Sequence, residues 1–291
     1  GDIFYYFYPY RDYASMALRA GRIPLWNPYL FMGSPFLANS QAGFFYPFNL
    51  LMSWLDVTRS INWTIVLHIF IAASGVYVFT RSHFKLSILA AWLAAISFGL
   101  GGYLGTQIEH VNQLQGLAWI GWIFWAYESG MGDQGLGIRG LRSMLILSFF
   151  IALQLLAGHT QSVFITVFGL GVYAVWPALE ALMVTSSTAS GLVLFRQRFF
   201  AALRMTVARL WRLVFACISA GLLSAIQLLP TVELTRLSAR SGGLSTNLAV
   251  SFSLDPRVLG RSLLPDYSGA LPSGGEFTAF FSVAAIVLML F

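Results

Sequence analysis

Three charged residues in the second half of the chain have the spacing of a phosphate-binding helix face. They are Glu233, Arg236 and Arg240, and Pro230 just before them favours the start of a new helix. Spacings of three and seven place all three side chains on one face, with the two arginines one turn apart. Two guanidinium groups so arranged can hold a phosphate between them. An intrahelical salt bridge between Glu233 and Arg236 is the open alternative, and it would still leave one cation in excess.

Two short turns elsewhere carry acid, histidine and amide side chains. One turn contains Glu109 and His110, and the other contains His159 and Gln161. A histidine in such a turn commonly makes only a structural hydrogen bond. However, the charge pattern described below places both turns on the same side of a membrane as Glu233. The side chains could therefore bind a phosphate or the hydroxyl groups of a sugar together.

The composition is that of a polytopic membrane protein. Hydrophobic residues make up 57% of the chain and charged residues 10%, whereas soluble domains carry about 25% charged residues. The mean hydropathy is +0.72. Cys217 is the single cysteine, which excludes an internal disulfide framework. The sequence has no HExxH, CxxC, DxD, P-loop or Rossmann glycine pattern.

Uncharged apolar runs close to the ~20 residues needed to cross hydrocarbon predict an all-α bundle over residues 61–291. Because residues 143–183 are too many for one tilted span, we expect two spans that turn at the GHTQ sequence, residues 158–161. The expected spans lie at about 61–80, 86–105, 113–127, 143–157, 160–183, 210–230 and 277–291. The last run is still apolar where the sequence stops, and we expect the sequence to be part of a longer protein that also has an earlier span.

The distribution of lysine and arginine predicts the orientation of these spans. One set of alternate loops contains nine Lys and Arg and three carboxylates, so we expect it to be cytoplasmic. Its segment 184–208 is expected to lie on anionic headgroups. The opposite set of loops is balanced, because it contains eight arginines and eight Asp or Glu residues, and we expect it on the exterior. It comprises residues 1–60, 106–112, 157–160 and 231–276. The cytoplasmic loops thus account for the net charge of +6, which gives no support to nucleic-acid binding.

The first exterior loop, residues 1–60, is expected to combine an interfacial helix with an irregular cap. Residues 11–22 predict a helix that lies in the interface plane. Its basic face consists of Arg11, Ser15, Arg19 and Arg22. Residues 23–55 carry no charge, yet their four prolines prevent an unbroken helix in lipid. Their aromatic residues favour the membrane–water boundary, so we expect this stretch to pack as a cap over the bundle.

Several blocks of the sequence resemble one family of membrane proteins. Residues 1–49 begin with an acidic residue and contain RIPLWNPYLFMGSP and QAGFFYP. Later blocks are AGHTQ at 157–161, QLLPTVELTRLSARSGGL at 227–244 and FSLDPRVLGRSLLPDYSG at 252–269. In this order they resemble the YfhO-like bacterial membrane proteins, a branch of the GT-C class of glycosyltransferases. The resemblance covers most of the chain.

This resemblance implies a GT-C-like helical bundle in the bacterial cell membrane. It implies transfer of a sugar from a polyprenyl-phosphate carrier to an exterior glycan, lipid or protein. A catalytic carboxylate is implied at the position of Asp2, where it would accept the proton of the acceptor hydroxyl. Asp2 could instead be only the polar end of a preceding span, and Asp12 is a weaker rival. Some members of the wider class use a divalent cation, for which Asp2 with Glu109 or Glu233 could supply oxygen ligands.

Two other functions are compatible with the same residues. A transporter or flippase would place its binding residues near the bilayer midplane on broken helices, whereas the candidate charges here gather outside the expected spans. Within the later spans only Gln154 and Gln227 are strongly polar. A non-catalytic scaffold would have no cavity beside Asp2. The sequence therefore favours a membrane glycosyltransferase over both.

Overall fold

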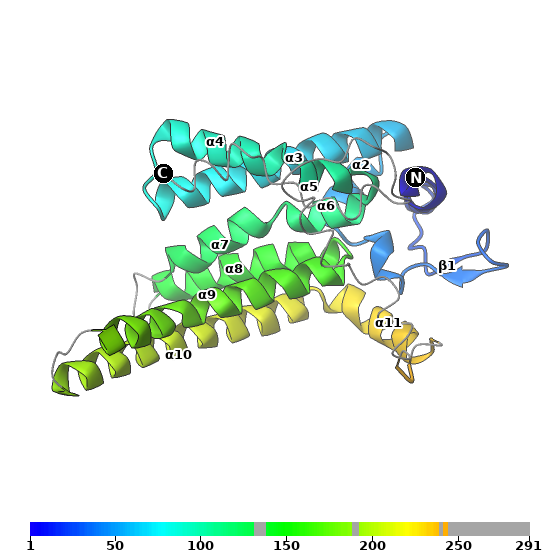
Figure 1. Ribbon diagram of the computed structural model, residues 1–291. Helices are drawn as coiled ribbons and strands as arrows, with labels where there is room; N and C mark the ends of the chain where they lie inside the picture. Colours follow the sequence, from blue (N-terminus) through cyan, green and yellow to red (C-terminus); the bar gives the residue numbers. More distant parts are fainter. Residues whose placement is uncertain (131–137, 188–191, 239–240, 244–291) are drawn as a thin grey trace, which may run out of the picture.

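The computed structural model is mostly helical and describes residues 1–130, 138–187, 192–238 and 241–243 (Figure 1). Four helical stretches of this part are long and apolar enough to cross a membrane, and a shorter apolar helix covers Gly140–Leu156. The four stretches are Val57–Ser82, Ile88–Glu109, Thr160–Glu180 and Phe199–Leu223. They agree with the prediction of an all-α membrane protein. Residues 244–276 of the loop expected at 231–276, and the whole span expected at 277–291, lie outside the described residues.

The helices of the bundle follow the N-terminal region in the chain. They are α3 (Val57–Ser82), α4 (Ile88–Gly99), α5 (Gly102–Thr106), the 3-10 helix η3 (Gln107–Glu109), α6 (Val111–Leu117), α7 (Ile120–Ser129), α8 (Ile138–Leu156), α9 (Thr160–Ser187), α10 (Leu192–Leu223) and α11 (Ala225–Arg236). Because α8 ends and α9 begins on either side of residues 157–159, the prediction of two helices that turn near 158–161 is confirmed.

The span expected at 113–127 is divided in the structure. Residues 113–127 were expected as a single element, but the helix breaks between α6 and α7. The side-chain amide of Gln154 donates a 3.0 Å hydrogen bond to the carbonyl of Gly116, which satisfies a backbone acceptor at the end of α6. A polar side chain from another helix thus stabilises a break that hydropathy does not reveal.

The helix around Pro230 begins earlier than the sequence predicted. α10 ends at Leu223 and α11 starts at Ala225, so Pro230 lies inside α11 and does not begin it. The break occurs at Ser224, which is fully buried and whose hydroxyl donates to the carbonyl of Ala152 on α8 at 3.3 Å. The prediction that Pro230 fixes the helix start is therefore wrong, because a tertiary contact ends the preceding helix first.

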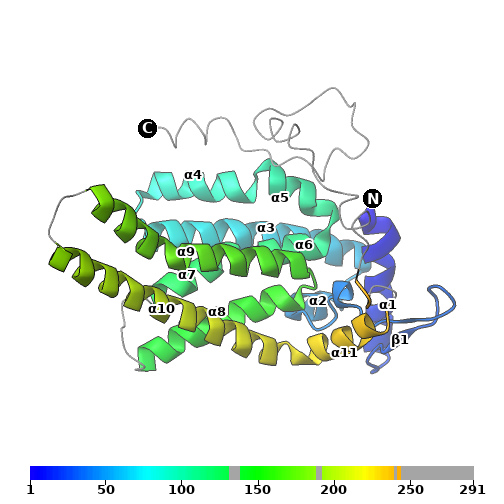
Figure 2. The same cartoon turned by 60° about the horizontal axis from the view of Figure 1, so that its bottom comes forward.

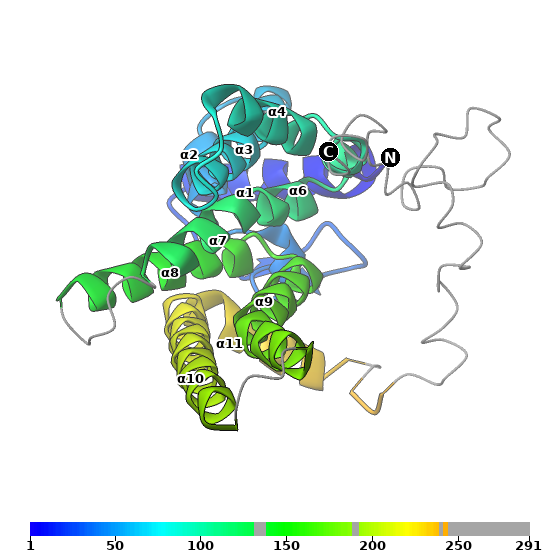
Figure 3. The same cartoon turned by 60° about the vertical axis from the view of Figure 1, so that its left-hand side comes forward.

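The bundle is layered, with α7 and α8 between the α3–α4 pair and the α9–α10 pair (Figures 1 and 3). α3 and α7 approach closely at Gly75 and Gly121, where a Cβ on Gly121 would collide with the backbone of α3. Such small residues permit close helix contacts in membranes. The main core lies between α7, α8, α9 and α10, and its fully buried side chains include Ile123, Tyr127, Leu147, Leu170 and Ala216.

The N-terminal region covers one end of this bundle. Its elements are the π-helix η1 (Ile3–Phe7), α1 (Tyr8–Arg19), β1 (Trp26–Asn27), β2 (Ser34–Pro35), the 3-10 helix η2 (Ser40–Ala42) and α2 (Pro47–Met52). Figures 1 and 2 show that α1 runs across the end of the bundle rather than along it. The placement of this helix in the plane of a membrane interface stays a prediction.

The polar face of α1 is turned toward the protein. The Ser15 hydroxyl donates to the carbonyl of Ser53 at 2.7 Å, and the Arg19 guanidinium donates to the carbonyl of Leu55 at 3.1 Å. These carbonyls follow α2, where backbone acceptors need donors from outside the helix. Met16, in contrast, is half exposed. The basic face therefore binds the loop before α3.

Residues 23–55 form the expected cap, with an inner and an outer part. Phe36, Phe44 and Tyr46 are buried and anchor the stretch on the bundle. The short antiparallel pair β1–β2 extends beyond them, and the side chains of Tyr29 and Phe31 near its turn are exposed (Figure 1). The four prolines thus prevent a membrane-spanning helix without preventing a packed structure.

Candidate functional site

Two expected site residues meet at this end of the bundle. Oδ2 of Asp2 lies 3.4 Å from Nε2 of His110. Asp2 directly precedes η1, whereas His110 joins η3 to α6, so the pair connects parts of the chain that are about a hundred residues apart. The side chain of Asp2 is 58% exposed and that of His110 is 28% exposed. The pair is therefore accessible from solvent.

Glu109 and His159 lie beside this pair. The carboxylate of Glu109 packs directly against Gly1. His159 lies in the turn between α8 and α9, where burial and the neighbouring charge of His110 lower the pKa of its imidazole. Its Nδ1 accepts a 3.2 Å hydrogen bond from the backbone N–H of Ser162. We refer to Asp2, Glu109, His110 and His159 as the acid–histidine cluster.

The other expected site residues do not join this cluster. Gln161 is exposed at the start of α9. Glu233 and Arg236 are exposed on α11, and among the described residues they form no ion pair with each other or with the cluster. Figures 1 and 2 show α11 apart from the N-terminus at the same end of the bundle. Arg240 lies outside the described residues.

The described residues contain no group of three or more His, Cys, Asp or Glu side chains arranged to hold a metal ion. Asp2 and Glu109 still offer carboxylate oxygens, the ligands that Mg²⁺ and Ca²⁺ prefer. The chemistry that the cluster can perform without a metal is proton transfer, because a carboxylate and an imidazole lie at near hydrogen-bonding distance.

A second polar site, which the sequence analysis did not single out, surrounds Arg11. Its Nη1 donates to the hydroxyl of Thr64 at 2.9 Å, and its Nη2 donates to Oδ1 of Asn49 at 2.9 Å. Nη1 also lies 3.5 Å from the hydroxyl of Ser60. The side-chain amide of Gln115 donates to the same Asn49 oxygen at 2.6 Å. Burial lowers the pKa of the Arg11 guanidinium to about 10, so that it remains charged at pH 7.

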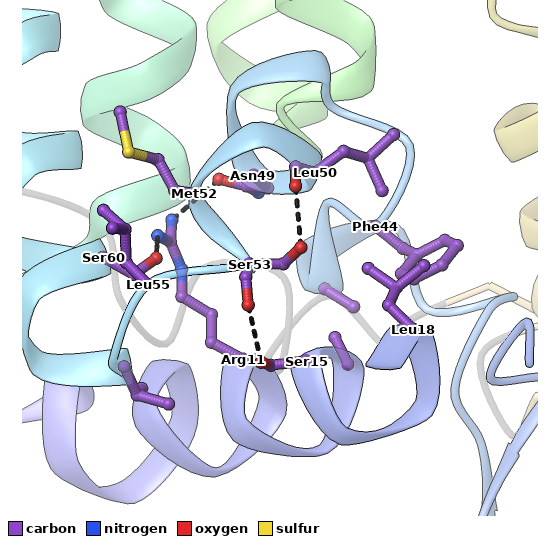
Figure 4. Close-up of a pocket in the computed structure, with 13 residues that line it drawn as sticks. Arg11, Ser15, Leu18, Phe44, Asn49, Leu50, Met52, Ser53, Leu55 and Ser60 are labelled. Atoms are coloured by element: carbon purple, nitrogen blue, oxygen red, sulfur yellow. Dashed lines mark hydrogen bonds between the residues drawn. The ribbon is translucent and has the colours of Figure 1, made fainter. Parts of the chain in front are cut away.

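A small pocket opens beside this guanidinium, between α1, α2 and the start of α3 (Figure 4). Its volume of about 20 Å³ has room for an ordered water or one oxygen atom of a larger group. Figure 4 shows Arg11 reaching from α1 toward Asn49 and Ser60, with Phe44, Leu50 and Met52 also on the wall. Asp2 does not line this pocket.

The signal that could have found this second site is the presence of isolated polar residues in apolar runs. Asn49 lies in the uncharged stretch 23–55 and Gln115 lies in the run expected to span at 113–127. Polar side chains in such runs are costly unless they have partners, so they tend to mark contacts inside the protein. Arg11 was assigned only to a helix face, because the spacing on α1 does not show what the face contacts.

Comparisons with protein-family models, with curated proteins and with solved structures give no match for this chain.

Proposed function

We propose that this protein is a membrane glycosyltransferase with a GT-C-like fold. It would transfer a sugar from a polyprenyl-phosphate carrier to an exterior glycan, lipid or protein. The observation that carries the proposal is the acid–histidine cluster, in which Asp2 lies 3.4 Å from His110 at the end of the bundle. This end carries α1, the helix expected at the membrane surface, which is where a lipid-linked sugar would present its phosphate.

In the proposed reaction, the acceptor oxygen forms a bond to the anomeric carbon of the sugar, and the bond from that carbon to the carrier phosphate breaks. Asp2 accepts the proton of the acceptor hydroxyl. His110 stands beside Asp2 and orients its carboxylate, while Glu109 and His159 contribute polar groups for sugar hydroxyls. The electron pair of the broken bond remains on the phosphate, which leaves as the free carrier.

The departing phosphate needs positive charge in the transition state. Arg236 and Arg240 are proposed for this role, with Gln161 and Glu233 at the edge of the site. Because Arg236 is exposed and separate from the cluster, this role requires α11 to approach the N-terminus when the donor binds. A divalent cation bound by Asp2 and Glu109 would supply the same charge.

A transporter gains no specific support from the described part of the bundle. The polar side chains there contact one another within the packed interior. Gln154 donates to Thr166 at 2.9 Å, and His68 lies 2.6 Å from the Tyr46 hydroxyl. A transporter would instead direct such groups into a substrate path near the bilayer midplane.

The experiment that tests this proposal measures sugar transfer from a panel of labelled polyprenyl-phosphate sugars by membranes containing the full-length protein. We expect Asp2→Asn to reduce turnover by about 10²- to 10⁴-fold, the usual contribution of a general base. Donor binding should persist, because the substitution keeps the size of the side chain. Asp12→Asn is the matched control, since Asp12 lies on α1 outside the cluster, and it should retain turnover.

Full turnover by Asp2→Asn would remove Asp2 from the reaction. Equal losses in both variants would indicate damage to α1 rather than to catalysis. If no sugar of the panel is transferred by the wild type, the transferase proposal itself is wrong.

A further inference from the structure

The Arg11 guanidinium is a partly buried positive charge whose hydrogen-bonding partners are neutral. Its three hydrogen-bonding contacts are the hydroxyls of Ser60 and Thr64 and the amide oxygen of Asn49. Within the part of the chain that the structure describes, no Asp or Glu forms an ion pair with it. Buried charges are normally compensated by an opposite charge. The charge of Arg11 is therefore not compensated by a carboxylate of the described residues.

The hydrogen-bonding capacity of Arg11 is also incomplete. A guanidinium carries five N–H donors, and the contacts on Nη1 and Nη2 engage three of them. Two donors remain for another acceptor on the same side chain. Arginine is the residue best suited to hold phosphate or carboxylate oxygens in this way.

The pocket beside Arg11 limits what this acceptor can be. Its volume of about 20 Å³ admits an oxygen-sized group but no sugar ring. Two of its hydroxyls already donate to backbone carbonyls, that of Ser15 to Ser53 and that of Ser53 to Leu50. The remaining wall is largely apolar and includes Leu18 and Met52. A single anionic oxygen on an amphiphilic molecule fits these surroundings.

The position of the pocket points to the membrane surface. It lies between α1, which crosses the end of the bundle, and the first turn of the apolar helix α3 (Figures 2 and 4). The headgroups of a bilayer lie at the ends of its spanning helices. A phosphate group at this depth is therefore within reach of Arg11.

We propose that Arg11 binds a phosphate group, which enters the pocket through one of its oxygens and completes the contacts that fix α1 to α2 and α3. The phosphate belongs either to an anionic phospholipid or to a free phosphate ion. This inference does not depend on the transferase proposal, because it concerns binding alone and uses no residue of the acid–histidine cluster.

The test measures the melting temperature and the ligand affinity of the full-length protein in a non-ionic detergent. The probes are inorganic phosphate, dihexanoyl phosphatidylglycerol and dihexanoyl phosphatidylcholine. We expect dihexanoyl phosphatidylglycerol to raise the melting temperature of the wild type. A similar effect of inorganic phosphate would identify free phosphate as sufficient, whereas its absence would identify the lipid as the source. If neither anion binds, the proposal is wrong.

Substitutions of Arg11 locate the effect. Arg11→Gln keeps hydrogen-bonding groups but removes the charge, and it should weaken binding of the anion by at least about tenfold. Arg11→Lys keeps the charge and should retain part of the affinity. Arg59→Gln is the matched control, because Arg59 is an exposed arginine at the same end of the bundle. Equal affinities of Arg11→Gln and the wild type would contradict the proposal.

Asn49→Asp provides a test that does not require the loss of Arg11. This substitution places a carboxylate at the position now 2.9 Å from Nη2 of Arg11, so it supplies the missing anion from within the chain. We expect Asn49→Asp to abolish the response to the phosphate probes. A response equal to that of the wild type would show that the anion binds elsewhere, even if Arg11→Gln fails to fold.

Discussion

At the scale of single residues, Tyr46 is the contact that fixes the cap to the bundle. The Nδ1 of His68 lies 2.7 Å from the carbonyl of Thr64, which can only accept, so Nδ1 donates and Nε2 accepts. The Tyr46 hydroxyl donates to this Nε2 at 2.6 Å and accepts from the indole N–H of Trp119 at 2.9 Å. One hydroxyl thus satisfies two buried polar groups, one from α3 and one from the break between α6 and α7.

We therefore expect Tyr46→Phe to destabilise the protein. The substitution keeps the ring but leaves Nε2 of His68 and the N–H of Trp119 without their partner, at a cost of about 1–3 kcal/mol for each buried group. The free energy of unfolding in detergent micelles, measured by denaturant titration, checks this. Tyr5→Phe is the control, because Tyr5 is 86% exposed. Equal stabilities of the two variants would show that the Tyr46 hydroxyl is not part of a buried network.

The candidate site could be predicted only in part from residue types. Asp2, Glu109, His110 and His159 were expected on one side of the membrane, and the structure brings them together. The expected partnership with Arg236 is not present in the described residues. Charge patterns place a residue on one side of a bundle, but they do not set distances within that side, which depend on how the loops fold.

At the scale of elements, the cap packs closely against the turn between α8 and α9. Gly158 in this turn has φ +85°, a left-handed conformation that side chains disfavour. A Cβ there would also collide with the carbonyl oxygen of Ser40 in η2. The glycine therefore fulfils two requirements, a backbone conformation and a close approach.

We expect Gly158→Ala to lower the free energy of unfolding by roughly 2 kcal/mol or more, because the left-handed conformation alone costs about 1–2 kcal/mol. Gly169→Ala is the matched control on α9, where open space surrounds the glycine and alanine favours the helix by about 0.5–1 kcal/mol. The changes in the free energy of unfolding caused by the two substitutions should have opposite signs when they are measured in the same micelles. A Gly158→Ala variant with the same free energy of unfolding as the wild type would mean that η2 does not pack on this turn.

The elements themselves were predictable where hydropathy alone determines them. The uncharged run at 61–80 lies within a long apolar helical stretch, and the runs at 86–105 and 160–183 largely overlap two others, Ile88–Glu109 and Thr160–Glu180. The breaks at Ala118–Trp119 and at Ser224 were not predictable, because they depend on Gln154 and Ala152 from another helix. A run of apolar residues indicates where a helix forms, whereas contacts from other helices decide where it ends.

At the scale of the whole molecule, the connections of the bundle separate into two groups. The N-terminal helix, the β1–β2 pair, α6 and α11 lie at one end, and the connection between α3 and α4 lies at the other (Figure 2). The described parts of the balanced loops, which include residues 1–60, 106–112 and 157–160, lie at the first end, and the positively charged loop with Arg81 and Lys85 lies at the second (Figure 2). The segregation of charge along the chain therefore matches the segregation of the loops in space.

This segregation predicts which end of the molecule faces the cytoplasm. In a Cys217→Ser background, a cysteine introduced by Tyr29→Cys should react with a membrane-impermeant maleimide in right-side-out vesicles, because Tyr29 is 77% exposed beside the acid–histidine end. A cysteine introduced by Ser82→Cys, at the opposite end of α3, should react only after the vesicles are permeabilised. The Cys217→Ser protein alone controls for background labelling. The reverse pattern would place the cluster in the cytoplasm, where it could not transfer sugars to an exterior acceptor.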